Sequence, residues 1–296
     1  MVIEKPTTGT QEETLLEARG ISKSYESGGI WQRHAVRVQA LDQLSLKIKL
    51  HGVLAIVGES GSGKSTLARC LALMEKPDVG SILLSDEDLV KLPKHRLRSL
   101  RPELQMIHQD VATSFNPRFT ALQCVEEPLL IQGGTISDER HRQALYWMDQ
   151  VGLPASFSGR SPLELSRGQR QRLAIARALI RKPRLLIFDE SLSGLDLLVK
   201  ERIVDLLMDL RWRFSLTFVF ISHDLRMVAD IAEHVIVMQA GRIVEEQQTA
   251  MLFAAPQHSH TKMLIMAMPT MSRLSQDEPE ARAVSGADTD TAEQRP

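Results

Sequence analysis

The sequence has only two cysteines among its 296 residues, Cys70 and Cys124. They lie far apart, and neither has neighbouring side chains that would complete a metal site. This scarcity argues against both a disulfide framework and a cysteine-based metal centre. A reducing compartment such as the cytoplasm is the simpler setting for such a chain.

The sequence also lacks a strong charge of either sign. A formal net charge of -1 argues against a protein that binds nucleic acid by neutralising phosphates, although it leaves room for a local basic patch. The apolar fraction of 43% and the charged fraction of 25% are ordinary for a soluble protein. A chain of this length can hold one large α/β domain or two smaller ones.

Long hydrophobic runs are missing as well. The longest apolar runs fall well short of the roughly 20 residues that a membrane-spanning helix needs. The segment from Met1 to Gln11 does not have the apolar core of a signal peptide. We therefore expect any connection to a membrane to go through a partner protein.

The most informative stretch that is present is a glycine-rich segment with the pattern G-x-x-x-x-G-K-[ST]. It follows the apolar run Val53 to Val57 and precedes a run with helical spacing, which is the order of a P-loop. Glycines and the helix start would turn backbone N–H groups toward phosphates. Lys64 would reach the outer phosphates and Ser65 would ligate Mg²⁺. The alternative is a glycine-rich turn with a chance lysine. The predicted phosphate-binding residues are Gly58, Glu59, Ser60, Gly61, Ser62, Gly63, Lys64, Ser65 and Thr66.

Strands are predicted on the N-terminal side of this loop. Leu15 to Ile21 and Val36 to Ile48 have strand-like patterns, with a loop extension from Glu26 to His34 between them. Tyr25 precedes that loop, where it could stack on a purine ring or pack at the sheet edge. After the P-loop helix, a strand is predicted from Ser81 to Leu84.

The middle of the chain has a different pattern. No long strand is predicted between Val111 and Pro162, whereas Thr120 to Leu130 and Ser137 to Gly152 have helical spacing, which indicates a helical insertion. The residues expected to face its interior are Leu145, Trp147, Met148 and Val151. Central strands follow at Leu185 to Glu190 and from Leu216, and an edge hairpin at Val235 to Val244.

Four polar side chains follow apolar strand candidates. Asp189 and Glu190 end one such run, and buried carboxylates need a positive partner such as a Mg²⁺-nucleotide. Asp189 could hold the metal and Glu190 could polarise an attacking water. Because the carboxyl ends of parallel strands share one edge, Gln109 and His223 are expected there too. The alternative is that these are strand-end groups turned to solvent.

A second phosphate-binding end is predicted at Leu165 to Arg172. Ser166 is a good N-cap for a helix that continues toward Pro183. Its exposed N–H groups would suit a phosphate. One chain has no obvious way to close both ends on one nucleotide.

Together these motifs resemble the ordered motif set of the ATP-binding cassette (ABC) ATPases over roughly residues 15–246. The resemblance rests on Gly58 to Thr66, Gln109, Leu165 to Gln169, Leu185 to Glu190, Ser193 to Asp196 and His223. It implies an α/β fold, with a P-loop NTPase (RecA-like) core, an N-terminal antiparallel β-subdomain and an inserted α-helical subdomain. It also implies a head-to-tail dimer in which Ser166, Gly168 and Gln169 serve the partner's ATP. In this family Tyr25 would stack on adenine, Gln109 would contact the metal and His223 would brace the γ-phosphate.

A narrower resemblance is to the importers of oligopeptides, dipeptides and nickel. It rests on Gln109 to Thr120 and Pro256 to Lys262. Three departures are visible: Arg167 replaces a usual glycine of the signature, Val111 a common proline, and Ser259-His260 the usual Pro-Tyr. Arg167 at the nucleotide-facing helix start could alter ATP turnover.

The resemblance implies the ATP-hydrolysing subunit of a peptide importer at the cytoplasmic face of the membrane. Expected partners are two transmembrane permease subunits, a second ABC ATPase subunit (a paralogue or a copy of itself) and, indirectly, a substrate-binding protein, with no nucleic acid. The expected division is an ATPase domain at 13–250 with the helical insertion at about 111–175, an extension at 251–271 and a disordered tail at 272–296. The alternatives are a nickel or chelated-metal importer and a soluble ABC ATPase of DNA repair or translation. A P-loop kinase would leave the signature and His223 unexplained.

Overall fold

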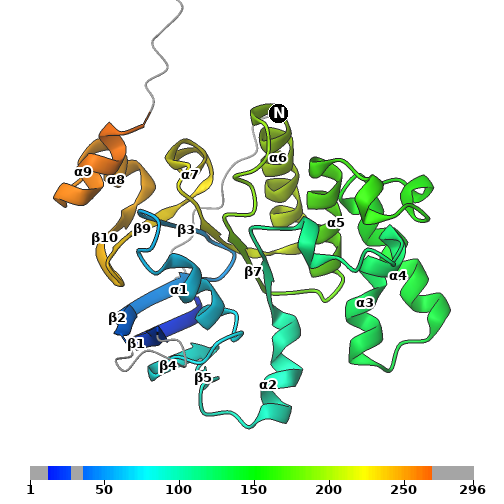
Figure 1. Cartoon of the computed structure of the whole chain (residues 1–296), viewed down its shortest axis with the longest axis horizontal. Helices are drawn as coiled ribbons and strands as arrows, with labels where there is room; N and C mark the ends of the chain where they lie inside the picture. The colour runs from blue at the N-terminus through cyan, green and yellow to red at the C-terminus, as the bar shows by residue number, and fades with distance from the viewer. Residues whose placement is uncertain (1–12, 28–35, 269–296) are drawn as a thin grey trace, which may run out of the picture.

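The computed structural model describes residues 13–27 and 36–268. A six-stranded sheet in the order β10-β9-β3-β8-β7-β6 forms its centre (Figure 1). Five strands are parallel, and β10 pairs antiparallel with β9 at the edge, which confirms the predicted edge hairpin. The strands are β3 (Val53–Val57), β6 (Leu104–Ile107), β7 (Leu185–Asp189), β8 (Thr217–Ile221), β9 (His234–Gln239) and β10 (Arg242–Gln248).

A second, antiparallel sheet has the order β2-β1-β4-β5. Its strands are β1 (Thr14–Ser27), β2 (Val36–Lys49), β4 (Val79–Leu84) and β5 (Glu87–Asp88). The prediction that a loop begins at Glu26 is wrong, because Glu26 and Ser27 still pair with Arg37 and Val36 of β2. Cross-strand pairing thus extends β1 beyond its apolar pattern. The rest of the predicted loop, residues 28–34, lies outside the described residues.

The predicted start of β4 at Ser81 is also wrong by two residues. The strand begins at Val79, and Gly80 lies inside it with φ 97°. A side chain there would place a Cβ 2.6 Å from the carbonyl oxygen of Arg19, where the pairing of β1 with β4 changes register. Glycine is therefore needed inside this strand for a close backbone approach.

The central sheet has a separate core on each face. Successive side chains of a strand point to opposite faces. In β7, Leu186 and Phe188 pack with the helical side of the molecule, whereas Leu185 and Ile187 pack with the antiparallel sheet and the P-loop helix. All five residues of β7 are buried, as are those of β3 and β8, which explains why these strands are apolar throughout.

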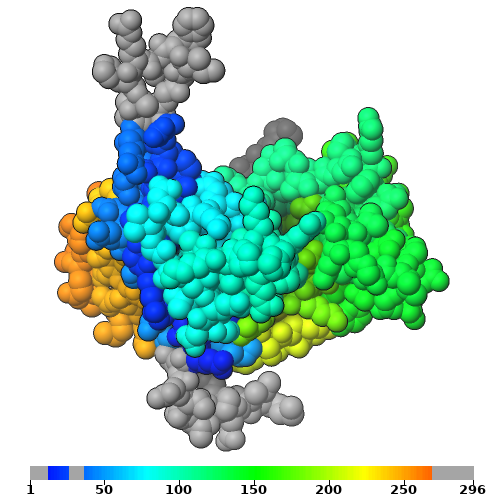
Figure 2. All heavy atoms as spheres, turned by 90° about the horizontal axis from the view of Figure 1, so that it is seen from below, coloured from blue at the N-terminus to red at the C-terminus, as the bar shows by residue number. Residues whose placement is uncertain are grey.

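The predicted helical insertion is present. It contains α3 (Ala121–Gln132), α4 (Ser137–Gln150) and short 3-10 turns, and it leads into α5 (Arg167–Leu179). Trp147, Met148 and Val151 are buried as predicted, but Leu145 is only partly buried, because it packs at the margin of the core cluster. Figure 2 places this insertion (green) on the opposite side of the antiparallel sheet from the C-terminal helices (orange).

The remaining helices are α1 (Lys64–Leu71), α2 (Lys94–Leu100), α6 (Leu197–Phe214), α7 (Leu225–Ile231), α8 (Thr249–Ala254) and α9 (Ser259–Met266). A third, smaller core joins α7 and α8 to strands β3 and β9. Within residues 13–27 and 36–268, none of the helices has the length and apolar character to cross a membrane. The predicted tail, residues 272–296, lies outside the described part of the chain.

Candidate nucleotide-binding site

The P-loop joins β3 to α1 at the carboxyl edge of the central sheet, as predicted. Its backbone depends on glycine at both ends, because Gly58 and Gly63 have φ angles of 148° and 102°. A Cβ at Gly58 would lie 2.2 Å from the carbonyl oxygen of Met238, and one at Gly63 would lie 2.3 Å from that of Ala40. The loop therefore rests directly on neighbouring backbone that leaves no room for side chains.

Lys64 lies inside this loop with 4% of its surface exposed. Its Nζ donates to the carbonyl oxygens of Gly58 (2.8 Å) and Glu59 (2.6 Å) and to the Ser62 hydroxyl (3.3 Å). Burial lowers the pKa of the ammonium group, and the carboxylates of Glu190 and Asp189 oppose that change. The lysine thus sits among loop oxygens with its charge directed to the inside of the phosphate cradle.

Ser65 and Asp189 form the contact between the P-loop helix and β7. The Ser65 hydroxyl donates to Oδ1 of Asp189 over 2.9 Å. Asp189 is only 7% exposed, and burial raises the pKa of its carboxyl group, against the effect of the Ser65 hydrogen bond. A carboxylate in this position is incompletely compensated by its own chain, so it is suited to receive a cation.

Glu190 is the meeting point of the other predicted catalytic side chains. Nε2 of Gln109 donates to its Oε2 over 3.4 Å, and Nδ1 of His223 lies 3.7 Å from the same oxygen. The Glu190 backbone has φ 47° and donates to the carbonyl oxygen of Ile221 on β8. Side chains from the ends of β6, β7 and β8 thus converge, as the parallel-strand argument predicts.

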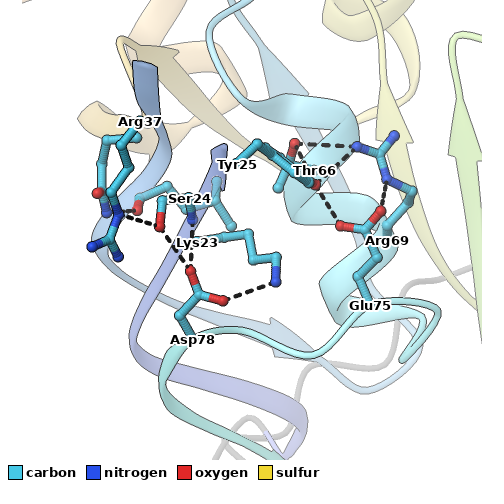
Figure 3. A network of polar contacts seen from close by, with 10 residues as sticks. Lys23, Ser24, Tyr25, Arg37, Thr66, Arg69, Glu75 and Asp78 are labelled. Atoms are coloured by element: carbon cyan, nitrogen blue, oxygen red, sulfur yellow. Dashed lines mark hydrogen bonds and ion pairs between the residues drawn. The ribbon is translucent and has the colours of Figure 1, made fainter. Parts of the chain in front are cut away.

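Tyr25 lies beside α1, where Figure 3 shows its hydroxyl among three polar side chains. The hydroxyl donates to the carboxylate of Glu75 and accepts from Arg69 over 3.2 Å, and Thr66 lies 3.4 Å away. Arg69 also donates to Glu75 over 2.9 Å. These contacts hold the end of β1 against the P-loop helix. Sequence reasoning missed Arg69, in the last turn of α1, and Glu75, which follows that helix; their only signal in the sequence was their opposite charge.

Asp78 fixes the same strand end from the other side (Figure 3). Its carboxylate accepts from Nζ of Lys23 (2.9 Å) and from the backbone N–H of Ser24 (2.8 Å). These contacts, led by Lys23, lower its pKa to about 2. The position of Tyr25 is thus set by two anchored neighbours in its own strand.

The second predicted phosphate-binding end is the start of α5. Ser166 accepts from the backbone N–H of Gln169 (3.2 Å), and the Gln169 side chain accepts from that of Ser166 (2.9 Å), which makes a capping box. A Cβ at Gly168 would lie 2.7 Å from Cγ1 of Val199. In the described chain, Ser166, Gly168 and Gln169 make no hydrogen bond to residues 58–66. The structure does not bring the two ends together within one chain.

Comparison with known proteins identifies the family. A family model described as ABC transporter matches residues 41–193. The di/tripeptide transport ATP-binding protein DppF of Pseudomonas aeruginosa is 40% identical over 260 residues, which cover 88% of this chain and 80% of that protein. The chain belongs to the ABC transporter family.

Other relatives agree with this assignment. The oligopeptide transport ATP-binding protein AppF of Bacillus subtilis is 39% identical over 264 residues, 88% of this chain and 80% of that protein. A dimeric post-hydrolysis structure of the ATP-binding cassette MJ0796 bound to ADP and Pi has a TM-score of 0.69 at 29% identity, covering 79% of this chain and 98% of that one. The predicted ABC family, P-loop NTPase fold and ATPase class are confirmed.

Two polar contacts of this ABC ATPase escaped sequence reasoning. Nζ of Lys200 on α6 lies 2.7 Å from Oδ2 of Asp224, which also caps α7 by accepting from the N–H of Met227. This pair fixes the residue next to His223. The signature residue Arg167 donates to the carbonyl oxygen of Gly194 over 3.3 Å and ties the start of α5 to the segment before α6. No local pattern links these residues, because the fold alone brings them together.

Proposed function

We propose that this chain is the ATP-hydrolysing subunit of an importer for short peptides. The observation that carries the ATPase role is the convergence of Gln109 and His223 on Glu190 beside the Ser65–Asp189 pair. The peptide cargo is supported by relatives named for di/tripeptide and oligopeptide transport. The predicted division of the chain is part of the same proposal. It consists of an ATPase domain at 13–250, which contains the helical insertion at about 111–175, an extension at 251–271 and a tail at 272–296.

Lys64 and the P-loop N–H groups bind the phosphates of ATP in this proposal. The first turn of α1 has no side-chain cap, so its N–H groups are available to an anion. When ATP binds, Nζ of Lys64 gives up its hydrogen bonds to the loop carbonyl oxygens and donates to phosphate oxygens instead. Tyr25, at the end of β1, provides the ring that stacks on adenine.

Ser65, Asp189 and Gln109 fit a Mg²⁺ ion. Hydroxyl, carboxylate and amide oxygens are the hard ligands that this ion prefers. The buried Asp189 carboxylate, whose pKa is raised by burial, is a group that a cation would stabilise in its charged form. A bound Mg²⁺ ion would neutralise part of the negative charge of the ATP phosphates.

Glu190 acts as the general base of the hydrolysis. Its carboxylate takes a proton from the attacking water, while Gln109 holds the same carboxylate from the β6 side. His223 follows the same end of β8, on the other side of β7 from Gln109, and braces the γ-phosphate. The ion pair between Lys200 and Asp224 keeps the turn that carries His223 in place.

A second ATPase subunit completes the site. Ser166 at the start of α5 is exposed, and in the described residues the start of α5 makes no hydrogen bond to its own P-loop, so Ser166, Gly168 and Gln169 serve ATP held by a partner in a head-to-tail dimer. We favour a paralogue as that partner over a second copy. Two transmembrane permease subunits anchor the pair at the cytoplasmic face, and a substrate-binding protein delivers the peptide.

The test is purification of the full-length tagged chain from membranes, followed by reconstitution of the co-purified complex into proteoliposomes. We expect two integral-membrane proteins to co-purify and ATP-dependent uptake of a radiolabelled dialanine peptide. Glu190→Gln should abolish uptake, whereas Glu201→Gln, an exposed change on α6, should not. Uptake of nickel instead of peptide would contradict the cargo. Co-purification with DNA or ribosomes and no membrane protein would contradict the transport role.

A further inference from the structure

A cavity of about 620 Å³ lies between α4, the end of α5 and the end of α6, outside the nucleotide site. Its volume is within the range of about 300–1,000 Å³ that is usual for small-molecule sites. Lys182 and Pro183, just before β7, and Leu216, just before β8, line it. The nucleotide site lies at the opposite ends of the same two strands. Five residues of strand separate the two places, which is roughly 16 Å.

Aromatic rings form one wall of this cavity. The rings of Tyr146 and Trp147 are 5.3 Å apart at 77°, and those of Trp147 and Phe214 are 4.8 Å apart at 51°. Trp147 is buried, whereas Tyr146 is 47% exposed. A planar ligand can therefore add a further ring to an existing cluster of one edge-to-face pair and one tilted pair.

The charged side chains of the cavity have one positive charge in excess, because Arg142 and Lys182 both act on the single carboxylate of Glu139. Glu139 is fully engaged: its Oε1 accepts from Gln143 over 2.8 Å and its Oε2 accepts from Arg142 over 2.5 Å. The Lys182 ammonium group and the Tyr146 hydroxyl make neither a hydrogen bond nor an ion pair anywhere in the described chain. Two solvent-exposed donors beside a wall of rings, in a lining with an excess positive charge, match an anion that carries an aromatic group.

We infer that this cavity binds a small aromatic carboxylate, whose ring packs against Trp147 and whose carboxylate accepts from Lys182 and Tyr146. This site is independent of the proposed peptide cargo and of ATP. Because its walls come from the helical insertion (α4) and from the core (α6), a bound ligand links the two parts of the molecule.

Isothermal titration calorimetry on the full-length chain tests the inference with three probes. Indole-3-acetate supplies ring and carboxylate, tryptamine supplies the ring with a positive charge, and cyclohexylacetate supplies the carboxylate without a ring. We expect indole-3-acetate to bind with a Kd on the order of 1 mM or lower, and the other two at least about 5-fold more weakly. Saturating Mg²⁺-ATP should leave this affinity unchanged. Equal binding of all three probes, or displacement by ATP, would overturn the inference.

Two substitutions locate the binding. Lys182→Asn removes the charge at a position with φ 53°, which asparagine tolerates, and Tyr146→Phe removes only the hydroxyl. We expect a loss of about 5-fold in affinity for the first and about 3-fold for the second. Lys262→Gln on α9 is the matched control and should change nothing. Unchanged affinity in both cavity variants, with an unchanged melting temperature, would refute the site.

Discussion

Two helix starts in this molecule are both suited to phosphate, and they are built in opposite ways. At α1 the N-cap is Gly63, no side chain caps the first turn, and Lys64 and Thr66 are buried. At α5 the N-cap Ser166 forms a capping box with Gln169, and Ser166 is exposed. The first is held in place by its own chain and has free N–H groups. The second supports its own helix and has an exposed N-cap, and in the function proposed above its ligand is held by a partner.

The largest expected effect comes from adding a methyl group to Gly63, at the start of α1. Gly63→Ala would push a Cβ to 2.3 Å from the carbonyl oxygen of Ala40, so the loop has to move. We expect ATP affinity to fall by about 100-fold, because displacements near 1 Å can cost that much, and stability to fall by about 2–4 kcal/mol. Calorimetry with ATP and thermal unfolding measure both quantities.

The matched control for this prediction is Gly61→Ala in the same loop. A Cβ there meets nothing within 4 Å, and only its φ of 81° opposes the change. The cost should be about 1 kcal/mol, with ATP binding largely kept. Equal loss of ATP affinity in the two variants would show that close backbone contact does not shape the loop.

Ser166→Ala should separate the two helix starts functionally. Loss of this N-cap costs about 1 kcal/mol, and Thr120→Ala costs the same, because Thr120 forms an identical capping box with Gln123 at α3. Only Ser166→Ala should lower ATP turnover of the assembled complex, by about 10-fold or more. ATP binding by the isolated chain should not change in either variant. Equal turnover in the two variants would mean that Ser166 only stabilises its helix.

Asp189→Asn should stabilise the nucleotide-free chain. The pKa of this carboxyl group is raised in the folded state above its ordinary value of 3.8, so the folded state holds the proton more tightly than the unfolded state does. Stability is therefore lost as pH rises above that value, and asparagine avoids this loss. We expect the variant to melt a few degrees higher at about pH 7, with the difference narrowing as the pH falls toward about 4, near the ordinary pKa of 3.8. A lower melting temperature for the variant at both pH values would contradict this account.

The smallest expected effect uses the two thiols, since Cys70 lies in α1 and Cys124 in α3. Burial raises the pKa of each to about 11, so about 0.1% of either is thiolate at pH 8 and labelling requires opening of the fold. ATP bound at the P-loop stabilises the closed form of α1, so with ATP at about twice its Kd the labelling of Cys70 by a thiol reagent should slow about 3-fold. Labelling of Cys124 in α3 should not slow. Equal protection of both would mean that the two regions open together.

Sequence patterns predicted the elements whose signal is local. The buried strands, the glycine loop and the N-cap at Ser166 follow from apolar runs, turn residues and caps within a few positions. The errors occurred where distant partners decide. Pairing with β2 extended β1 through Ser27, and close contact with Arg19 placed Gly80 inside a strand. These contacts join residues that no local window contains.

By itself, the sequence determined the P-loop, the signature and the side chains that follow each central strand, because each depends on residue types at fixed short spacings. Only the tertiary structure decided that Gln109 and His223 meet at one oxygen of Glu190, and that Lys64 turns into its own loop. It also decided that the two predicted phosphate-binding ends stay apart. The physical reason is that strand order in the sheet and packing of the helical insertion set these distances, and both depend on contacts between residues far apart in the chain.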